Sequence, residues 1–127
     1  MNKRSATVLV FLAILLVACG SKHLTQEQVE TAVNKGMYTV RARYHLPRAE
    51  VSVLGVTEDQ NANSAEADLR FANATFATEI QPCEWRGGKA VFKRYNEQGW
   101  TLTAIQVTDS NHTDYCNAEF PLNIPVQ

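Results

Sequence analysis

The spacing of the hydrophobic residues changes at Pro47, and this change most limits what the chain can fold into. Before Pro47, apolar residues recur every three or four positions, which is typical of an amphipathic helix. Thr25, followed three residues later by Gln28, forms a capping-box pattern that predicts the helix start. Because the residue before a proline disfavours helical backbone, we expect one helix over roughly residues 26–45.

After Pro47, apolar and polar residues alternate, which is typical of β-strands. We expect four strands, at residues 50–57, 65–80, 89–95 and 100–107. In the second strand the alternation changes parity after Phe71, which predicts a bulge or bend at that point. The expected fold class is therefore α+β: one N-terminal helix packed on a curved four-stranded antiparallel β-meander, with a disulfide-pinned C-terminal tail.

Residues 96–99, with the sequence Asn-Glu-Gln-Gly, predict a tight hairpin turn between the last two strands. Tyr95 and Trp100 would face each other across it as an aromatic pair. In such a hairpin, the numbers of paired residues sum to roughly 195, because the turn is centred near residues 97–98.

The same arithmetic makes a disulfide bond between the last two cysteines reachable. Cys83 would face position 112, and Cys116 lies four residues beyond that position. The first 18 residues, described below, indicate export to an oxidising compartment, in which such a bond persists. We therefore expect a Cys83–Cys116 disulfide that pins the C-terminal tail, residues 109–127, to the sheet.

The outline of one helix and one antiparallel sheet is similar to that of cystatin-like and nuclear transport factor 2-like (NTF2-like) domains. The segment 88–107, with Gly99, Trp100 and Leu102, looks like the closing hairpin of the NTF2-like domains. This resemblance concerns topology alone, so it implies no site residues.

The first 18 residues have the pattern of a secretory signal peptide. Lys3 and Arg4 precede a run, residues 6–18, that is apolar except for Thr7. This run is too short to cross a bilayer, since a membrane-spanning helix needs about 20 apolar residues. We expect residues 1–18 to be removed.

Residues 16–19, Leu-Val-Ala-Cys, resemble the lipobox of bacterial lipoproteins. The resemblance implies that Cys19 becomes the mature N-terminus and carries a covalent lipid, which anchors the chain in a membrane. Gly20 and Ser21 follow, in place of the aspartate that favours retention at the inner membrane. The implied location is the bacterial cell envelope, at the outer membrane facing the periplasm.

The lipidated cysteine and the tether that follows it, residues 19–24, are short. Residues 20–24 reach at most about 18 Å when fully extended. The single folded domain, residues 25–127, would therefore lie close to the bilayer. This arrangement favours a partner that is itself at the membrane.

Charge and motifs argue against several classes of function. Without Lys3 and Arg4, ten basic residues remain against thirteen acidic ones, a net charge of −3 that argues against a nucleic-acid binder. The sequence contains no phosphate-binding loop, no HExxH motif, no nucleophile elbow and no CxxC motif. Its three histidines are far apart, so we expect no metal site, no cofactor and no enzymatic activity.

The segment 85–88, Trp-Arg-Gly-Gly, lies beside Cys83 and predicts a turn-rich loop that the disulfide would hold rigid. Trp85 and Arg86 are the candidate interface residues, because rigid exposed aromatic side chains anchor protein contacts well. In the alternative interpretation, Trp85 folds back onto the sheet edge.

These features predict a lipid-anchored, non-catalytic accessory protein that binds another protein of the cell envelope. The alternative is a small inhibitor of a hydrolase, or a module that binds a small apolar ligand between helix and sheet. The identity of the partner and the oligomeric state stay open at this point.

Overall fold

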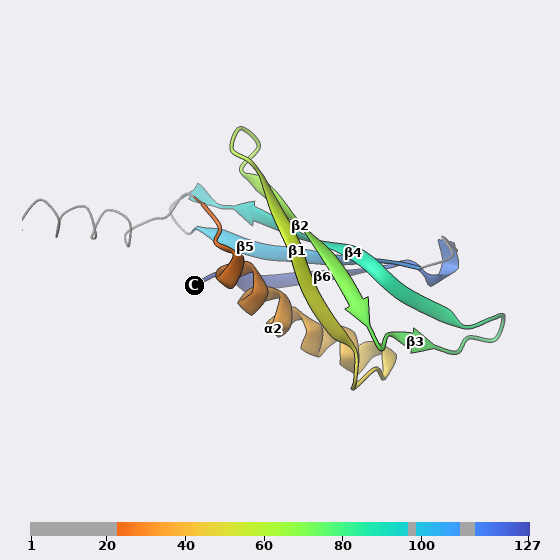
Figure 1. The fold of residues 1–127 in the computed structure, drawn as a ribbon. Coiled ribbons are helices and arrows are strands. Elements are labelled where there is room, and N and C mark those ends of the chain that lie inside the picture. Colours follow the sequence, from red (N-terminus) through yellow and green to blue (C-terminus); the bar gives the residue numbers. More distant parts are fainter. Residues whose placement is uncertain (1–22, 97–98, 110–113) are drawn as a thin grey trace, which may run out of the picture.

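A computed structural model describes residues 23–96, 99–109 and 114–127 of the chain. One α-helix lies across one face of an antiparallel sheet, which makes a two-layer α+β fold (Figure 1). The expected signal peptide, residues 1–18, and the expected lipidation site, Cys19, lie outside the described residues.

The helix α2, Gln26–Tyr44, begins at the predicted capping box. The Thr25 hydroxyl accepts the backbone N–H of Gln28 at 3.1 Å, and the Gln28 side-chain oxygen accepts the N–H of Thr25 at 3.0 Å. The helix ends where His45 adopts a left-handed φ of 55°. The face turned to the sheet is buried, and its residues are Val29, Ala32, Val33, Gly36, Met37 and Val40.

Over the residues that the structure describes, the sheet has six strands, and the 3-10 helix η2 precedes the last of them. Their bounds are β1 Glu50–Asp59, β2 Ser64–Ala72, β3 Thr75–Phe76, β4 Cys83–Arg94, β5 Trp100–Asp109, η2 Asp114–Cys116 and β6 Ala118–Pro125. The strand order is β1-β2-β4-β5-β6, and the short β3 pairs with the start of β4. All pairs are antiparallel. The meander was expected, but it has more strands than the four that the sequence indicated.

The C-terminal residues form a strand, which corrects the expected tail. β6 pairs with β5 from Val107↔Ala118 to Thr101↔Pro125. Phe120 of β6 is buried in the core beneath α2. The two prolines of β6 are compatible with a strand because β6 is at the edge of the sheet.

The expected long strand 65–80 is interrupted. β2 ends at Ala72, and Asn73 adopts a φ of 57°, which turns the chain before β3. This turn, two residues after Phe71, is the bend expected near that residue, and a further irregularity lies in the neighbouring β1, between Val53 and Gly55.

β4 starts at Cys83, so the segment 83–88, expected as a loop, belongs to the sheet. One glycine of this segment, Gly88, allows the strands to approach. A Cβ added to Gly88 would lie 2.1 Å from the carbonyl oxygen of Gln106 in β5. Gly88, which with Gly87 resembled a turn, therefore marks a close backbone contact.

The register of β4 and β5 agrees with the hairpin arithmetic. Its pairs include Gly87↔Thr108 and Ala90↔Ile105, whose numbers sum to the expected value of about 195. Trp100, however, pairs with Arg94 and not with Tyr95. Trp100 is buried, whereas Tyr95 is exposed, so the expected aromatic pair is wrong.

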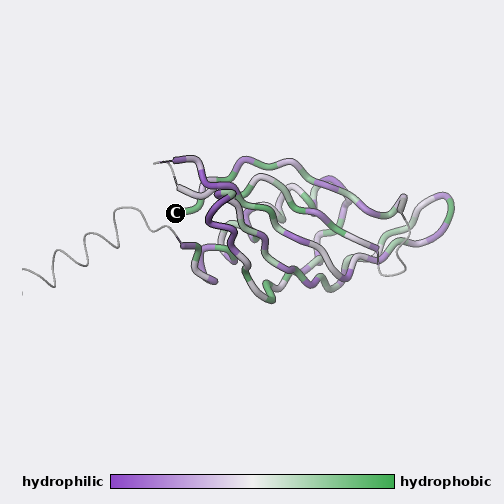
Figure 2. Tube along the Cα trace, turned by 90° about the horizontal axis from the view of Figure 1, so that it is seen from above, coloured by the Kyte–Doolittle hydropathy of each residue, from purple (hydrophilic) through white to green (hydrophobic). Residues whose placement is uncertain are grey.

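The core lies between α2 and the sheet, and the opposite face of the sheet is polar. Every second residue of β2, from Ala65 to Phe71, is buried against the helix. Figure 2 shows hydrophobic and hydrophilic residues alternating along the strands. We call the polar face, which includes Glu66, Arg70 and Lys89, the open face.

The domain has two distinct ends. The start of α2 and the C-terminus lie at one end, which we call the N-terminal end (Figure 1). The loop 77–82, Cys83 and η2 lie at the other, which we call the disulfide end.

Candidate functional site

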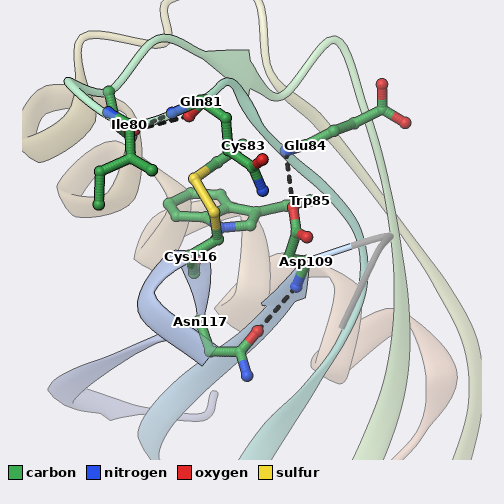
Figure 3. The surroundings of a disulfide bond; sticks show 9 residues. Ile80, Gln81, Cys83, Glu84, Trp85, Asp109, Cys116 and Asn117 are labelled. Carbon is green, nitrogen blue, oxygen red and sulfur yellow. Dashed lines mark hydrogen bonds between the residues drawn. A yellow bond between two sulfur atoms is a disulfide. The ribbon is translucent and has the colours of Figure 1, made fainter. Parts of the chain in front are cut away.

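The disulfide end contains the predicted Cys83–Cys116 bond. It joins the first residue of β4 to the last residue of η2, with a Cα–Cα distance of 5.6 Å (Figure 3). Both cysteines are buried. The bond ties the segment that precedes β6 to the start of β4, the central strand of the sheet.

Trp85 belongs to the core, which corrects its assignment as a surface anchor. It is 1% exposed, and its Nε1–H donates to the carbonyl oxygen of Cys116 at 2.7 Å. Its ring contacts those of Tyr44, Phe76 and Phe120 at centroid distances of 4.8 to 6.0 Å. Because residues 83–88 form a strand, every second side chain points toward the helix, and Trp85 is one of these. This placement is close to the alternative interpretation from sequence, in which Trp85 folds back onto the sheet edge.

Arg86, the other candidate interface residue, lies on the open face. Its side chain is 74% exposed, and its Nε–H donates to Glu84. Thr75 donates its hydroxyl proton to the other carboxylate oxygen of Glu84 at 3.4 Å. Glu84 therefore orients the guanidinium of Arg86.

Asp109 lies beside the disulfide and is 2% exposed. Its carboxylate accepts the backbone N–H of Glu84 at 2.9 Å, and its own N–H donates to the side chain of Asn117 at 2.8 Å (Figure 3). Ligand atoms of Cys83, Asp109 and Cys116 lie within 4.8 Å of one another. Since the disulfide uses both sulfur atoms, this group offers a metal ion only one carboxylate.

The loop 77–82 projects from the disulfide end, and the side chain of Thr78 holds its turn. The hydroxyl of Thr78 accepts the N–H groups of Ile80 and Gln81 at 3.2 and 3.1 Å, and it donates to the carbonyl of Gln81 at 2.6 Å. Ile80 is 77% exposed, the highest value among the exposed large hydrophobic residues of the described chain. The sequence interpretation missed this loop, although Pro82 could have indicated it.

A surface notch lies on the open face where β2 and β4 separate. Their pairing ends at Arg70↔Gly87, and the N–H of Trp85 donates instead to the carbonyl of Ala74 at 3.1 Å. The gap is an open cavity of about 520 Å³. Its polar rim is formed by Arg70, Asn73, Thr75, Glu84 and Arg86, and its buried apolar lining by Phe71, Ala74 and Trp85.

At the N-terminal end, Glu58 of β1 holds the residues that precede α2. Its carboxylate accepts the backbone N–H of Leu24 and contacts Nδ1 of His23 at 2.9 Å. Burial raises the pKa of Glu58, but the hydrogen bonds from His23, Leu24 and Gln60 and the charge of His23 together bring that pKa below its ordinary value. Residues 23 and 24 of the expected tether are thus fixed to the sheet.

Comparisons with protein-family models, with curated proteins and with solved structures returned no match for this chain. Within the described ranges, no helix is both long enough and apolar enough to cross a membrane.

Proposed function

We propose that this protein is a lipid-anchored, non-catalytic accessory protein of the bacterial cell envelope that binds another envelope protein. The observation that carries the proposal is the loop 77–82, which presents the exposed Ile80 at the end of the domain opposite the start of α2 (Figure 1). A contact residue at that end lies opposite His23, the described residue from which the chain leads back to the proposed lipid on Cys19.

The loop is well suited to a specific contact because it is ordered before binding. Three hydrogen bonds of Thr78 define its turn, and the disulfide holds Cys83 at its base. A rigid loop loses little conformational entropy on association, so more of the contact energy of Ile80 appears as affinity.

Site-specific photocrosslinking in cells tests this proposal. A photoreactive amino acid is placed at Ile80 of the full-length chain, and a matched one at Ala62, an exposed residue of the turn between β1 and β2. We expect one envelope protein to crosslink from position 80, none from position 62, and the adduct to disappear in a Cys19→Ala variant. Equal capture from both positions, or capture that survives Cys19→Ala, would contradict the proposal.

The projecting loop also favours a second candidate function, inhibition of a hydrolase, because a rigid loop with one exposed aliphatic side chain fits a substrate cleft. The full-length chain in detergent would be assayed against lysozymes and periplasmic proteases. Inhibition that is lost in Ile80→Asp but kept in Ala62→Asp would support this alternative. An unchanged inhibition constant in Ile80→Asp would reject it.

A further inference from the structure

We infer that the notch between β2 and β4 is a binding site for an acidic peptide segment of a partner protein, with Arg70 and Arg86 as the groups that hold its carboxylates. This inference rests on the proposed function, because it assigns a second contact to the same end of the domain. β3 borders the notch and leads directly into the loop 77–82. One partner can therefore contact both.

The shape of the notch follows from the way β2 ends. Phe71 and Ala72 are still paired with β1, through Val51 and Glu50, but they have no partner on the side of β4. Their backbone on that side borders the notch, where a peptide in extended conformation can form hydrogen bonds with it.

Arg70 is the available cation of the notch. Across the strands its partners are Ser52 of β1 and Gly87 of β4, neither of which carries a charge. The guanidinium of Arg70 forms no hydrogen bond or ion pair with another described residue. A guanidinium has five N–H donors in a planar fork that matches a carboxylate, so Arg70 can bind one in a bidentate manner.

Arg86 is also oriented to bind a carboxylate. Glu84 accepts its Nε–H, and Glu84 is itself fixed by the Thr75 hydroxyl and by its backbone N–H to Asp109. The terminal N–H groups of Arg86 stay available. An arginine that is positioned before binding loses less side-chain entropy when a carboxylate arrives.

The charges favour a carboxylate over a phosphate. Two guanidinium groups and one carboxylate, that of Glu84, leave the rim with a net charge of +1. The next cation on the open face, Lys89, is already paired with Glu66 at 3.1 Å and adds little. Arg70 and Arg86 can each bind one monovalent carboxylate, so a peptide distributes its negative charge along the notch, whereas a divalent phosphate concentrates that charge at one point. The notch is bordered by Thr75 of β3, which lies at the end of the domain opposite the start of α2, and this position disfavours a lipid headgroup as the ligand (Figure 1).

The test is a titration of the full-length chain in neutral detergent micelles, followed by the NMR signals of the arginine Nε–H groups. The probe is a short peptide of alternating Glu and Ala residues, and its matched control has Gln in place of Glu. We expect saturable binding of the Glu peptide alone, with shifts of the Arg70 and Arg86 signals. Arg70→Gln should weaken binding about tenfold or more, since it removes a charge-assisted hydrogen bond.

Arg48→Gln is the matched control, because it removes the same charge from an exposed arginine outside the notch. Circular dichroism shows whether each variant is folded, and Arg86→Gln gives a second, independent loss. Absence of binding, or an equal loss in Arg48→Gln, would overturn the inference. Tighter binding of inorganic phosphate, or displacement of the peptide by phosphatidylglycerol added to the micelles, would also overturn it. Since the titration uses a purified chain, its failure is distinguishable from a failure of crosslinking at Ile80.

Discussion

Gly87 and Gly88 are neighbours in β4, yet a side chain would meet different surroundings at the two positions. A Cβ at Gly88 would lie 2.1 Å from the carbonyl oxygen of Gln106 and 3.0 Å from the ring of Phe71. At Gly87 the nearest atom would be the Thr108 hydroxyl oxygen at 3.8 Å, which is an ordinary contact. The glycine at position 88 is therefore required by packing, whereas the glycine at position 87 is not.

We predict that Gly88→Ala lowers the free energy of unfolding by about 3 kcal/mol, because the clash involves backbone that can move only if β4 and β5 separate. Gly87→Ala is the matched control and should change it by less than about 1 kcal/mol. Urea unfolding followed by tryptophan fluorescence measures both. Similar urea midpoints for the two variants would show that β5 moves away at this position and relieves the clash.

At the scale of elements, the C-terminal segment is held by two separate devices. β6 forms a ladder with β5, and η2 is tied to β4 by the disulfide and by the hydrogen bond from Trp85 to the Cys116 carbonyl. The ladder does not need the disulfide, because its hydrogen bonds and the buried Phe120 lie along the sheet. Loss of the bond should therefore affect η2 more than β6.

We predict that the double variant Cys83→Ser, Cys116→Ser loses about 4 kcal/mol of unfolding free energy on the chain-entropy model, given the sequence separation of 33 residues. Urea unfolding of the oxidised wild type and the variant gives this difference. Hydrogen exchange should show that the amide of Phe120 stays protected while that of Cys116 exchanges faster. Unprotected exchange along β6 would mean that the disulfide, and not the ladder, holds the strand.

At the scale of the whole molecule, the domain has one end tied to its N-terminal segment and one end that projects a loop. Glu58 connects the residues before α2 to β1, so it sets the direction in which the chain enters the domain. The loop 77–82, which contains Ile80, and β3, which borders the notch, lie at the far end (Figure 1). The proposed lipid anchor at one end and the proposed contacts at the other would suit a protein that reaches from a membrane toward a partner.

The contact of Glu58 should depend on pH in a defined direction. Its pKa is lower in the folded chain than its ordinary value of 4.5, so its charged form favours folding above that value. We predict that Glu58→Gln costs no more than about 1 kcal/mol at pH 7 and that this cost disappears as the pH falls below 4.5. Thermal unfolding from pH 7 to pH 3 measures it. Glu50→Gln, at the other end of β1, is the matched control, because it removes the same charge from an exposed residue of the same strand.

The sequence by itself determined the features that depend on neighbouring residues. The capping box of Thr25 and Gln28 predicted the start of α2, and the turn near residues 97–98 predicted the register of β4 and β5. The register in turn made the Cys83–Cys116 bond reachable, and the structure confirms it. Each of these follows from helix periodicity or from the geometry of one hairpin, which a short stretch of chain specifies.

Only the tertiary structure decided which residues reach the surface. The pair Gly87-Gly88 resembles a turn in the sequence, and only the packing of β5 against Gly88 shows that the pair lies in a strand. The alternation of side chains along that strand then places Trp85 in the core. β6 becomes a strand because β5 offers an unpaired edge, although its own sequence contains two prolines. The notch exists because the end of β2 pairs only with β1, whereas the start of β4 pairs with β3. These features depend on strands that are distant in sequence, so no local pattern specifies them.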